Sequence, residues 1–212
     1  MIGRINLNNV SLVCVDDATT KEAYSLLTKI CREIKFGDVK LFSSIALNKN
    51  VTVIDPIKDI HDYDNFIYHN LNKYIQTDYC MIVQTDGHPI NFAAWDDKFL
   101  QFDYIAAPWL WNIDVNFQNK VGNSGFCIRS KKLLQTLCEK YPNYDSNKDG
   151  PEDEHISVKI DYFLKQNEGV DFAPVEVAQK FSVENSMYLG QFGFHGKSTR
   201  KMNKAVGIDL RL

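Results

Sequence analysis

The sequence predicts an α/β fold in which a mixed, mostly parallel central sheet is flanked by helices within a single domain. Short apolar runs rich in β-branched residues alternate with segments of helical periodicity, which is typical of strand–helix–strand units. The chain has 212 residues, of which 44% are hydrophobic. That length and apolar content suit one domain with a substantial core over residues 1–212, ending in a basic tail at 198–212.

The first strand is expected at residues 10–15, a continuous apolar run (VSLVCV) of the kind found in buried strands. Thr19 and Glu22 have the spacing of a capping box, which predicts that a helix begins there. Apolar residues at helical spacing continue to position 34, and Gly37 is expected to close this helix. Two further strands are expected at 39–42 and 51–54.

The remaining elements are predicted in the same way. A helix is expected at 64–75, a buried strand at 79–83, and another strand at 102–107 that Pro108 stops. Ser130 can cap a helix that carries apolar residues on one face, and Pro151 opens a further helix in its first turn. Residues 170–177 read as a late strand region, and the tail from 196 onward is basic and poorly patterned.

Composition and charge exclude several functional classes. There are 24 Lys and Arg against 27 Asp and Glu, a formal net charge of −3, whereas a dedicated nucleic-acid binder usually carries a basic excess. No apolar run reaches the length of a signal peptide core or a membrane span. The five cysteines form no C-x-x-C pair, which favours buried thiols in a reducing compartment. We therefore expect a cytoplasmic protein with no membrane span and no nucleic-acid partner.

The first chemical candidate is Gln84-Thr85-Asp86, directly after a buried strand. Open α/β sheets bind ligands at the carboxyl ends of their strands, and carboxylates there commonly hold Mg²⁺ or Mn²⁺ against a diphosphate. Taken alone, the segment is more typical of a turn than of a metal site, because Asp86 precedes Gly87.

Three other segments carry candidate chemistry. Residues 122–126 (GNSGF) form a Gly-rich loop that lets backbone approach a ligand, or simply a connection before the next helix. Residues 151–155 (PEDEH) offer a carboxylate base, although acids at a helix start usually only complement the helix dipole. His195 and Lys197 (FGFHGK) could bind a metal and a phosphate, although a single histidine is more often a surface residue.

The order of these segments resembles a nucleotide-sugar glycosyltransferase of the GT-A (Rossmann-like) fold. The segments DYIAAPW, VGNSGFCIRSKKLL, PEDEHI, FAPVEVAQKFSVE and FGFHG are similar to a little-characterised family of GT-A-like glycosyltransferases found in bacteria, fungi and large viruses. The length also resembles the N-terminal glycosyltransferase domains of multidomain chlorella-virus proteins that build capsid glycans. That viral resemblance implies a location in the host cytoplasm.

The resemblance implies roles for the donor and the metal. Asp86 and His195 would hold Mn²⁺ or Mg²⁺ in such an enzyme, and Gln84 stands where the first acid of the D-x-D motif is expected. This departure puts tight metal dependence in doubt. The residues that the resemblance places around the donor are Asp16, Asp17, Gln84, Thr85, Asp86, Asn123, Ser124, Gly125 and Lys197.

The resemblance also implies an acceptor side and a mechanism. Asp153 would act as the base of an inverting transfer and Glu152 would bind the acceptor, with the reverse assignment left open. Trp109 and Trp111 would form an apolar platform under a sugar ring, or would pack in the core. UDP is the expected donor nucleotide, with UDP-glucose as the first sugar and UDP-rhamnose as the alternative if the viral match holds, and a glycan would be the acceptor.

Two alternatives remain open from the sequence. A sugar nucleotidyltransferase usually has a Gly-rich, basic loop after its first strand, whereas residues 16–20 (DDATT) lack Gly, Lys and Arg. Release of pyrophosphate would identify such an enzyme. A non-catalytic nucleotide-sugar-binding module is the second alternative, and Gln84 is its best support. It predicts donor binding without turnover.

Overall fold

A six-stranded sheet forms the centre of the computed structural model, which describes residues 4–110, 112, 114, 116 and 120–212. The strand order is β3-β2-β1-β4-β7-β6, and β7 runs antiparallel to both of its neighbours while the other pairs are parallel. The predicted α/β class with a mixed, mostly parallel sheet is therefore confirmed. The strands are β1 (Ile5–Val15), β2 (Ile34–Ser43), β3 (Val51–Val53), β4 (Tyr79–Ile82), β6 (Tyr104–Ala106) and β7 (Cys127–Ser130).

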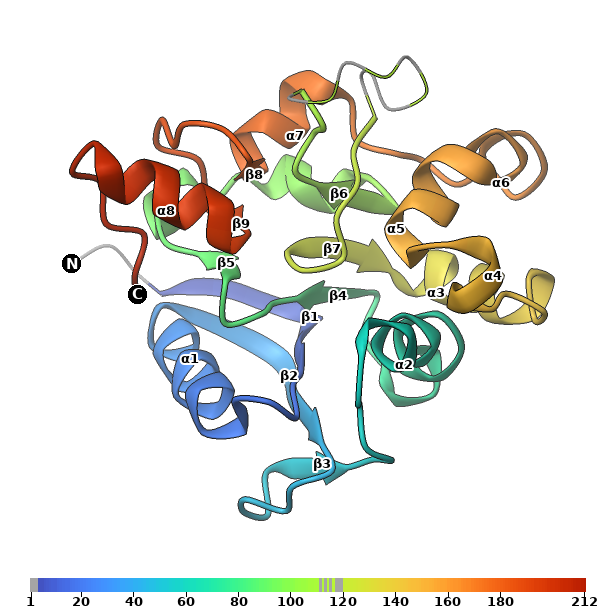
Figure 1. Cartoon of the computed structure of the whole chain (residues 1–212), viewed down its shortest axis with the longest axis horizontal. Coiled ribbons are helices and arrows are strands. Elements are labelled where there is room, and N and C mark those ends of the chain that lie inside the picture. Colours follow the sequence, from blue (N-terminus) through green and yellow to red (C-terminus); the bar gives the residue numbers. More distant parts are fainter. Residues whose placement is uncertain (1–3, 111, 113, 115, 117–119) are drawn as a thin grey trace.

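Helices flank this sheet (Figure 1). They are α1 (Thr20–Glu33), α2 (Ile60–Asn65), α3 (Lys131–Lys140), α4 (Ser146–Asp149), α5 (Glu152–Glu154), α6 (Asp161–Asn167), α7 (Val175–Phe181) and α8 (Lys197–Ala205). Helix α2 continues through a π-helical turn and a 3₁₀ turn to Tyr74, so the helix predicted at 64–75 begins earlier than expected. Within the described ranges, no helix is long and apolar enough to cross a membrane.

The first strand–helix unit forms largely as predicted. Residues 10–15 of β1 are all buried because this strand lies between β2 and β4 in the middle of the sheet. Helix α1 starts at the expected place, but its cap is different. The Asp16 carboxylate accepts hydrogen bonds from the Thr19 amide (2.5 Å) and the Thr19 hydroxyl (2.8 Å), in place of a Thr19–Glu22 capping box.

The prediction that Gly37 closes α1 is wrong. The helix ends at Glu33 and β2 begins at once, so Gly37 lies inside a strand. A Cβ atom at Gly37 would lie 2.0 Å from the Asn8 carbonyl oxygen. Gly37 is therefore needed for the close approach of β1 and β2, next to the register shift between Leu7 and Ser11.

The C-terminal third differs most from expectation. The strand region predicted at 170–177 is wrong: Phe172 makes only an isolated bridge to Tyr104, and Pro174 starts α7 as its N-cap. The tail that looked poorly patterned contains α8. Three short strands near it form a second sheet in the order β5-β9-β8, and they are β5 (Gly87–Pro89), β8 (Ser182–Glu184) and β9 (Gly193–His195).

Two smaller predictions hold. The Ser130 hydroxyl accepts a hydrogen bond from the Leu133 amide (3.0 Å) and caps α3. All five cysteines are free thiols, and three of them are buried in or beside the central sheet.

Candidate functional site

The carboxyl ends of β1 and β4 mark the point where the order of the central sheet reverses. The chain moves from β1 to β2 and β3 on one side, and then returns to place β4 on the other side of β1. Open α/β sheets bind ligands in the crevice at such a switch point. The candidate residues at 16–17 and 84–86 follow these two strands, so the parallel pairing of β1 and β4 brings the two segments side by side.

The carboxylates of Asp16 and Asp17 are already engaged by the protein. Asp16 caps α1, and Asp17 Oδ1 accepts hydrogen bonds from the Ser43 hydroxyl (2.7 Å) and the Ser44 amide (2.5 Å). Asp17 Oδ2 accepts a third from the Ile57 amide (2.7 Å). Burial raises the pKa of Asp17, but these hydrogen bonds outweigh it and hold the pKa below its ordinary value. Their geometry fits a role in shaping the crevice rather than the direct donor contact that the resemblance implied.

The segment Gln84–Asp86 is a tight turn that is fastened to the second sheet. Gln84 and Gly87 exchange two backbone hydrogen bonds of 2.7 and 3.0 Å. The Thr85 carbonyl accepts from an Arg200 Nη2 (2.8 Å), and the Asp86 carbonyl accepts from the Gly196 amide (2.8 Å). The turn explanation is therefore correct, and the same turn places Asp86 beside the start of α8.

His195 lies at the centre of the candidate site. Its Nδ1 atom is 2.9 Å from Glu184 Oε1 on the neighbouring strand β8 and also contacts the Asn123 side-chain amide. A Cβ atom placed on Gly125 would lie 2.1 Å from His195 Nε2 and 2.6 Å from Gln84 Oε1. The His195 ring and the Gln84 side-chain oxygen thus pack directly against Gly125, and any larger side chain at this position would collide with them.

The Gly-rich loop at residues 122–126 packs against His195 and contains a residue with an unusual backbone conformation. Asn123 has a φ angle of 105°, in the left-handed region that favours glycine. Its Oδ1 atom accepts hydrogen bonds from the Gly125 amide (2.7 Å) and the Phe126 amide (3.0 Å). The carbonyl of Ser124 accepts from the Tyr63 hydroxyl (3.4 Å). The loop predicted to approach the donor is therefore bound directly to His195.

Glu152 does not have the geometry of an acceptor ligand. Both of its carboxylate oxygens pair with Arg129 Nη2, at 2.8 and 3.0 Å, and both side chains are 0% exposed. The Arg129 guanidinium also lies over the Tyr104 ring, 5.1 Å from its centroid. The acceptor-binding role predicted for Glu152 disagrees with this burial, which fits a structural ion pair instead.

Asp153 is a partly buried carboxyl group whose ionisation the fold opposes. It is half-buried at the start of α5, and its Oδ1 atom accepts a hydrogen bond from the Glu154 amide (2.8 Å). Burial and the negative charge of Glu152, with smaller contributions from Glu184 and Asp64, raise the pKa of Asp153 to about 7. A carboxyl group with a pKa near neutrality can serve as a general base or acid.

Three residues of this site were missed by the sequence prediction: Asp64, Arg129 and Glu184. Asp64 is buried, and its carboxylate accepts a hydrogen bond from the Ser146 hydroxyl (2.7 Å). Burial raises the pKa of Asp64 to about 6. Arg129 and Glu184 are each the single charged residue of a short strand. The sequence contained one signal for Glu184, which ends the segment FAPVEVAQKFSVE. That segment is part of the family resemblance, but the resemblance implied no role for Glu184.

The remaining predicted residues lie at the margins. Trp109 is only 6% exposed, and a Cβ atom on Gly122 would lie 1.9 Å from its ring, so the core-packing alternative fits better than a sugar platform. Trp111 lies outside the described residues. Lys197 is exposed at the first position of α8, next to His195.

The predicted metal site is only partly assembled. In the part of the chain that the structure describes, no group of three or more His, Cys, Asp or Glu side chains is placed to hold a metal ion. His195 nevertheless shares one feature with metal-binding histidines, since the Glu184 carboxylate contacts its Nδ1 atom. A cation here would take most of its ligands from a diphosphate and water, as Mg²⁺ commonly does.

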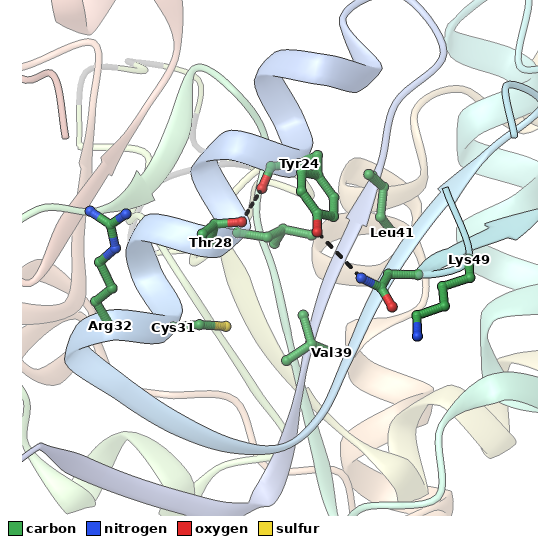
Figure 2. A pocket seen from close by; sticks show the side chains of 9 residues that line it. Tyr24, Thr28, Cys31, Arg32, Val39, Leu41 and Lys49 are labelled. Atoms are coloured by element: carbon green, nitrogen blue, oxygen red, sulfur yellow. Dashed lines mark hydrogen bonds between the residues drawn. The ribbon is translucent and has the colours of Figure 1, made fainter. Parts of the chain in front are cut away.

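A pocket of about 530 Å³ lies elsewhere, between α1 and β2 (Figure 2). Tyr24 and Leu41 line it, the Tyr24 hydroxyl accepts a hydrogen bond from the Asn50 amide (3.3 Å), and Cys31 points into the same region. No carboxylate or histidine lines this pocket, and its lining includes no residue of 16–17 or 84–86. It therefore lacks the acid–base groups found around His195.

Comparison with known proteins gives one match. A family model described as a protein of unknown function (DUF5672) matches residues 49–195, which is more than half of the chain. The matched region includes Gln84, Asn123, Asp153, Glu184 and His195. No curated protein and no solved structure matches the chain.

Proposed function

The chain belongs to the DUF5672 family of proteins of unknown function, and from its site we propose that it is a glycosyltransferase. It would move a hexose or deoxyhexose from a UDP-sugar to a hydroxyl of a glycan or glycoconjugate. The observation that carries this proposal is Asp153 at the start of α5, a carboxyl group whose pKa is raised to about 7 and which lies near enough to Glu184, the partner of His195, to be affected by its charge.

The donor side of the proposal rests on the switch point. The crevice between the ends of β1 and β4 is where an α/β sheet receives a nucleotide. The diphosphate would lie against the turn at 84–86 and the N-terminus of α8, where backbone amides and the exposed Lys197 favour negative charge. Asp16 and Asp17 contribute by fixing the loops that form the crevice wall.

The chemical step would be an inverting displacement. Asp153 accepts the proton of the acceptor hydroxyl while that oxygen forms a bond to the anomeric carbon, and the bond from that carbon to the UDP oxygen breaks. Lys197 and the α8 N-terminus offset the charge of the departing UDP. Asp86 and His195 would hold Mn²⁺ or Mg²⁺, which would supply Lewis-acid stabilisation of the same charge. His195 is held in orientation by Glu184 and Asn123.

Calorimetric titration with UDP, in Mn²⁺ and then in EDTA, tests the donor site. We expect binding that Asp86→Ala and His195→Ala weaken strongly. In a transfer assay with UDP-glucose and UDP-rhamnose, Asp153→Asn should lower turnover about 10²–10⁴-fold, the usual contribution of a general base. It should leave the affinity for UDP unchanged, and analysis of the product anomer by NMR should show inversion.

Glu154→Gln is the matched control, because Glu154 lies on the same helical turn and its carboxylate is 3.9 Å from Lys159. Near-normal turnover of Asp153→Asn, or a product with retained configuration, would contradict the assignment of the base. UDP binding with no transfer from any UDP-sugar would favour the non-catalytic binding module. Release of pyrophosphate from a sugar phosphate and a nucleoside triphosphate would favour the nucleotidyltransferase.

A further inference from the structure

A pocket of about 340 Å³ adjoins the candidate site on the side of Glu184, and we call it the Glu184 pocket. It lies between the segment that follows β6, where it includes Pro108 and Leu110, and strand β8 with the loop after it. Glu184 lines this pocket and also contacts His195 Nδ1. The pocket therefore shares Glu184 with the group of residues around His195.

The outer part of the Glu184 pocket is apolar. Pro108, Leu110, Met187 and Leu189 line it, and Leu110 is 56% exposed while Leu189 is 85% exposed. These are two of the large apolar side chains that the described chain leaves most open to water, and they meet at one hollow. A ligand that covers them with an apolar group would remove that surface from water.

The inner part of the pocket is polar and incomplete. Ser182 is 1% exposed, and its hydroxyl has no hydrogen-bond partner among the described residues. A buried hydroxyl without a partner is unfavourable, and such a group at a pocket wall is commonly satisfied by a ligand. Ser182 and Glu184 lie two residues apart on β8, so both side chains leave the strand on the same face.

We propose that the Glu184 pocket is the acceptor site, and that it takes a hydroxylated acceptor with an apolar substituent. The hydroxyl-bearing part would lie against Ser182 and Glu184, and an aryl or alkyl group would cover Leu110 and Leu189. This inference rests on the proposed transferase function, because only a transferase has an acceptor. Binding to the pocket can be measured without a donor. The preferred acceptor is thus an aryl or alkyl glycoside rather than an unsubstituted polar sugar.

Two probes that differ only in the apolar group test this inference: p-nitrophenyl β-D-glucoside and methyl β-D-glucoside. We expect the wild-type protein to bind the p-nitrophenyl compound at least tenfold more tightly in calorimetry. Leu110→Ser combined with Leu189→Ser should abolish that preference and leave UDP affinity unchanged. Val206→Ser is the matched control, because Val206 is 60% exposed and lies outside the pocket.

Ser182→Ala separates a ligand contact from a structural role. Removing a hydroxyl that has no partner should not lower the midpoint of urea unfolding, yet it should weaken the binding of both glucosides. Equal affinity for the two glucosides with intact UDP binding would overturn the inference, and so would a preference that survives the double leucine substitution. Preferential binding of the p-nitrophenyl compound without UDP binding would leave the pocket standing and contradict the transferase function.

Discussion

Asp153→Asn should make the protein more stable at neutral and alkaline pH. The folded structure raises the pKa of this carboxyl from an ordinary 3.8 to about 7, because burial and Glu152 oppose its ionisation. A carboxyl with a raised folded-state pKa contributes stability that is fully present below 3.8 and is lost as the pH rises through 7. Three pKa units correspond to about 4 kcal/mol. Asparagine keeps the shape and an oxygen that can accept from the Glu154 amide, but it never ionises.

Urea unfolding, followed by tryptophan fluorescence, measures this effect. We expect Asp153→Asn to raise the free energy of unfolding by about 2–4 kcal/mol at pH 8, since the side chain is half-buried and water screens part of the penalty. The gain should fall to about half or less at pH 5, where the folded wild-type carboxyl is protonated. Glu154→Gln should change the stability by less than about 0.5 kcal/mol at either pH. An equal gain at both pH values, or a loss at pH 8, would refute the reasoning.

Three further experiments test the packing at the site and in the second sheet. Gly125→Ala should lower UDP affinity at least tenfold in calorimetry, because its Cβ would lie 2.1 Å from His195 Nε2; an unchanged affinity would contradict the proposed donor position. Arg129→Met should lower the free energy of unfolding in urea by about 3–5 kcal/mol, because it leaves Glu152 buried and unpaired. Adding Glu152→Gln should recover most of that loss, and no recovery would contradict a stabilising role of the ion pair. His88 is a buried histidine on β5, and burial lowers its pKa to about 4. Its protonation costs stability as the pH falls from 6.5 to 4, opposite in sign to the effect of Asp153, so the stability of His88→Gln relative to wild type should rise over that range in pH-dependent unfolding.

The sequence predicted the parts of the fold that local patterns determine. The apolar run at residues 10–15 and the helical spacing after it are strong because a central strand and an amphipathic helix bury whole faces. The strands β5, β8 and β9 have three residues each, which is too short for any periodic signal. These strands form because each pairs with a strand that is distant in the sequence, as β5 pairs with β9. Position 37 was misinterpreted because the need for glycine there comes from Asn8 on another strand.

The site was predictable only where a motif carried it. His195, Asn123 and Asp153 stand in segments whose residue types suggested chemistry, and the structure brings His195 and Asn123 into contact. The sequence could not show that Glu152 and Asp153 have different surroundings, because the two acids are adjacent and chemically alike. Which acid is neutralised depends on Arg129, which is 23 residues away in the sequence and reaches one carboxylate only.

Unfavourable features of this chain collect at one edge of the sheet, and that distribution argues for a site rather than for a stable scaffold. Asn123 and Asn185 have positive φ angles of 105° and 46°, and one contacts His195 while the other follows Glu184. Strained backbone of this kind costs about 1–3 kcal/mol per residue. In the same region, burial and the charge of Glu152 oppose the ionisation of Asp153 and raise its pKa. A glycine at position 123 would relieve the strain but would remove the amide that contacts His195, so the strain persists because the side chain is needed there.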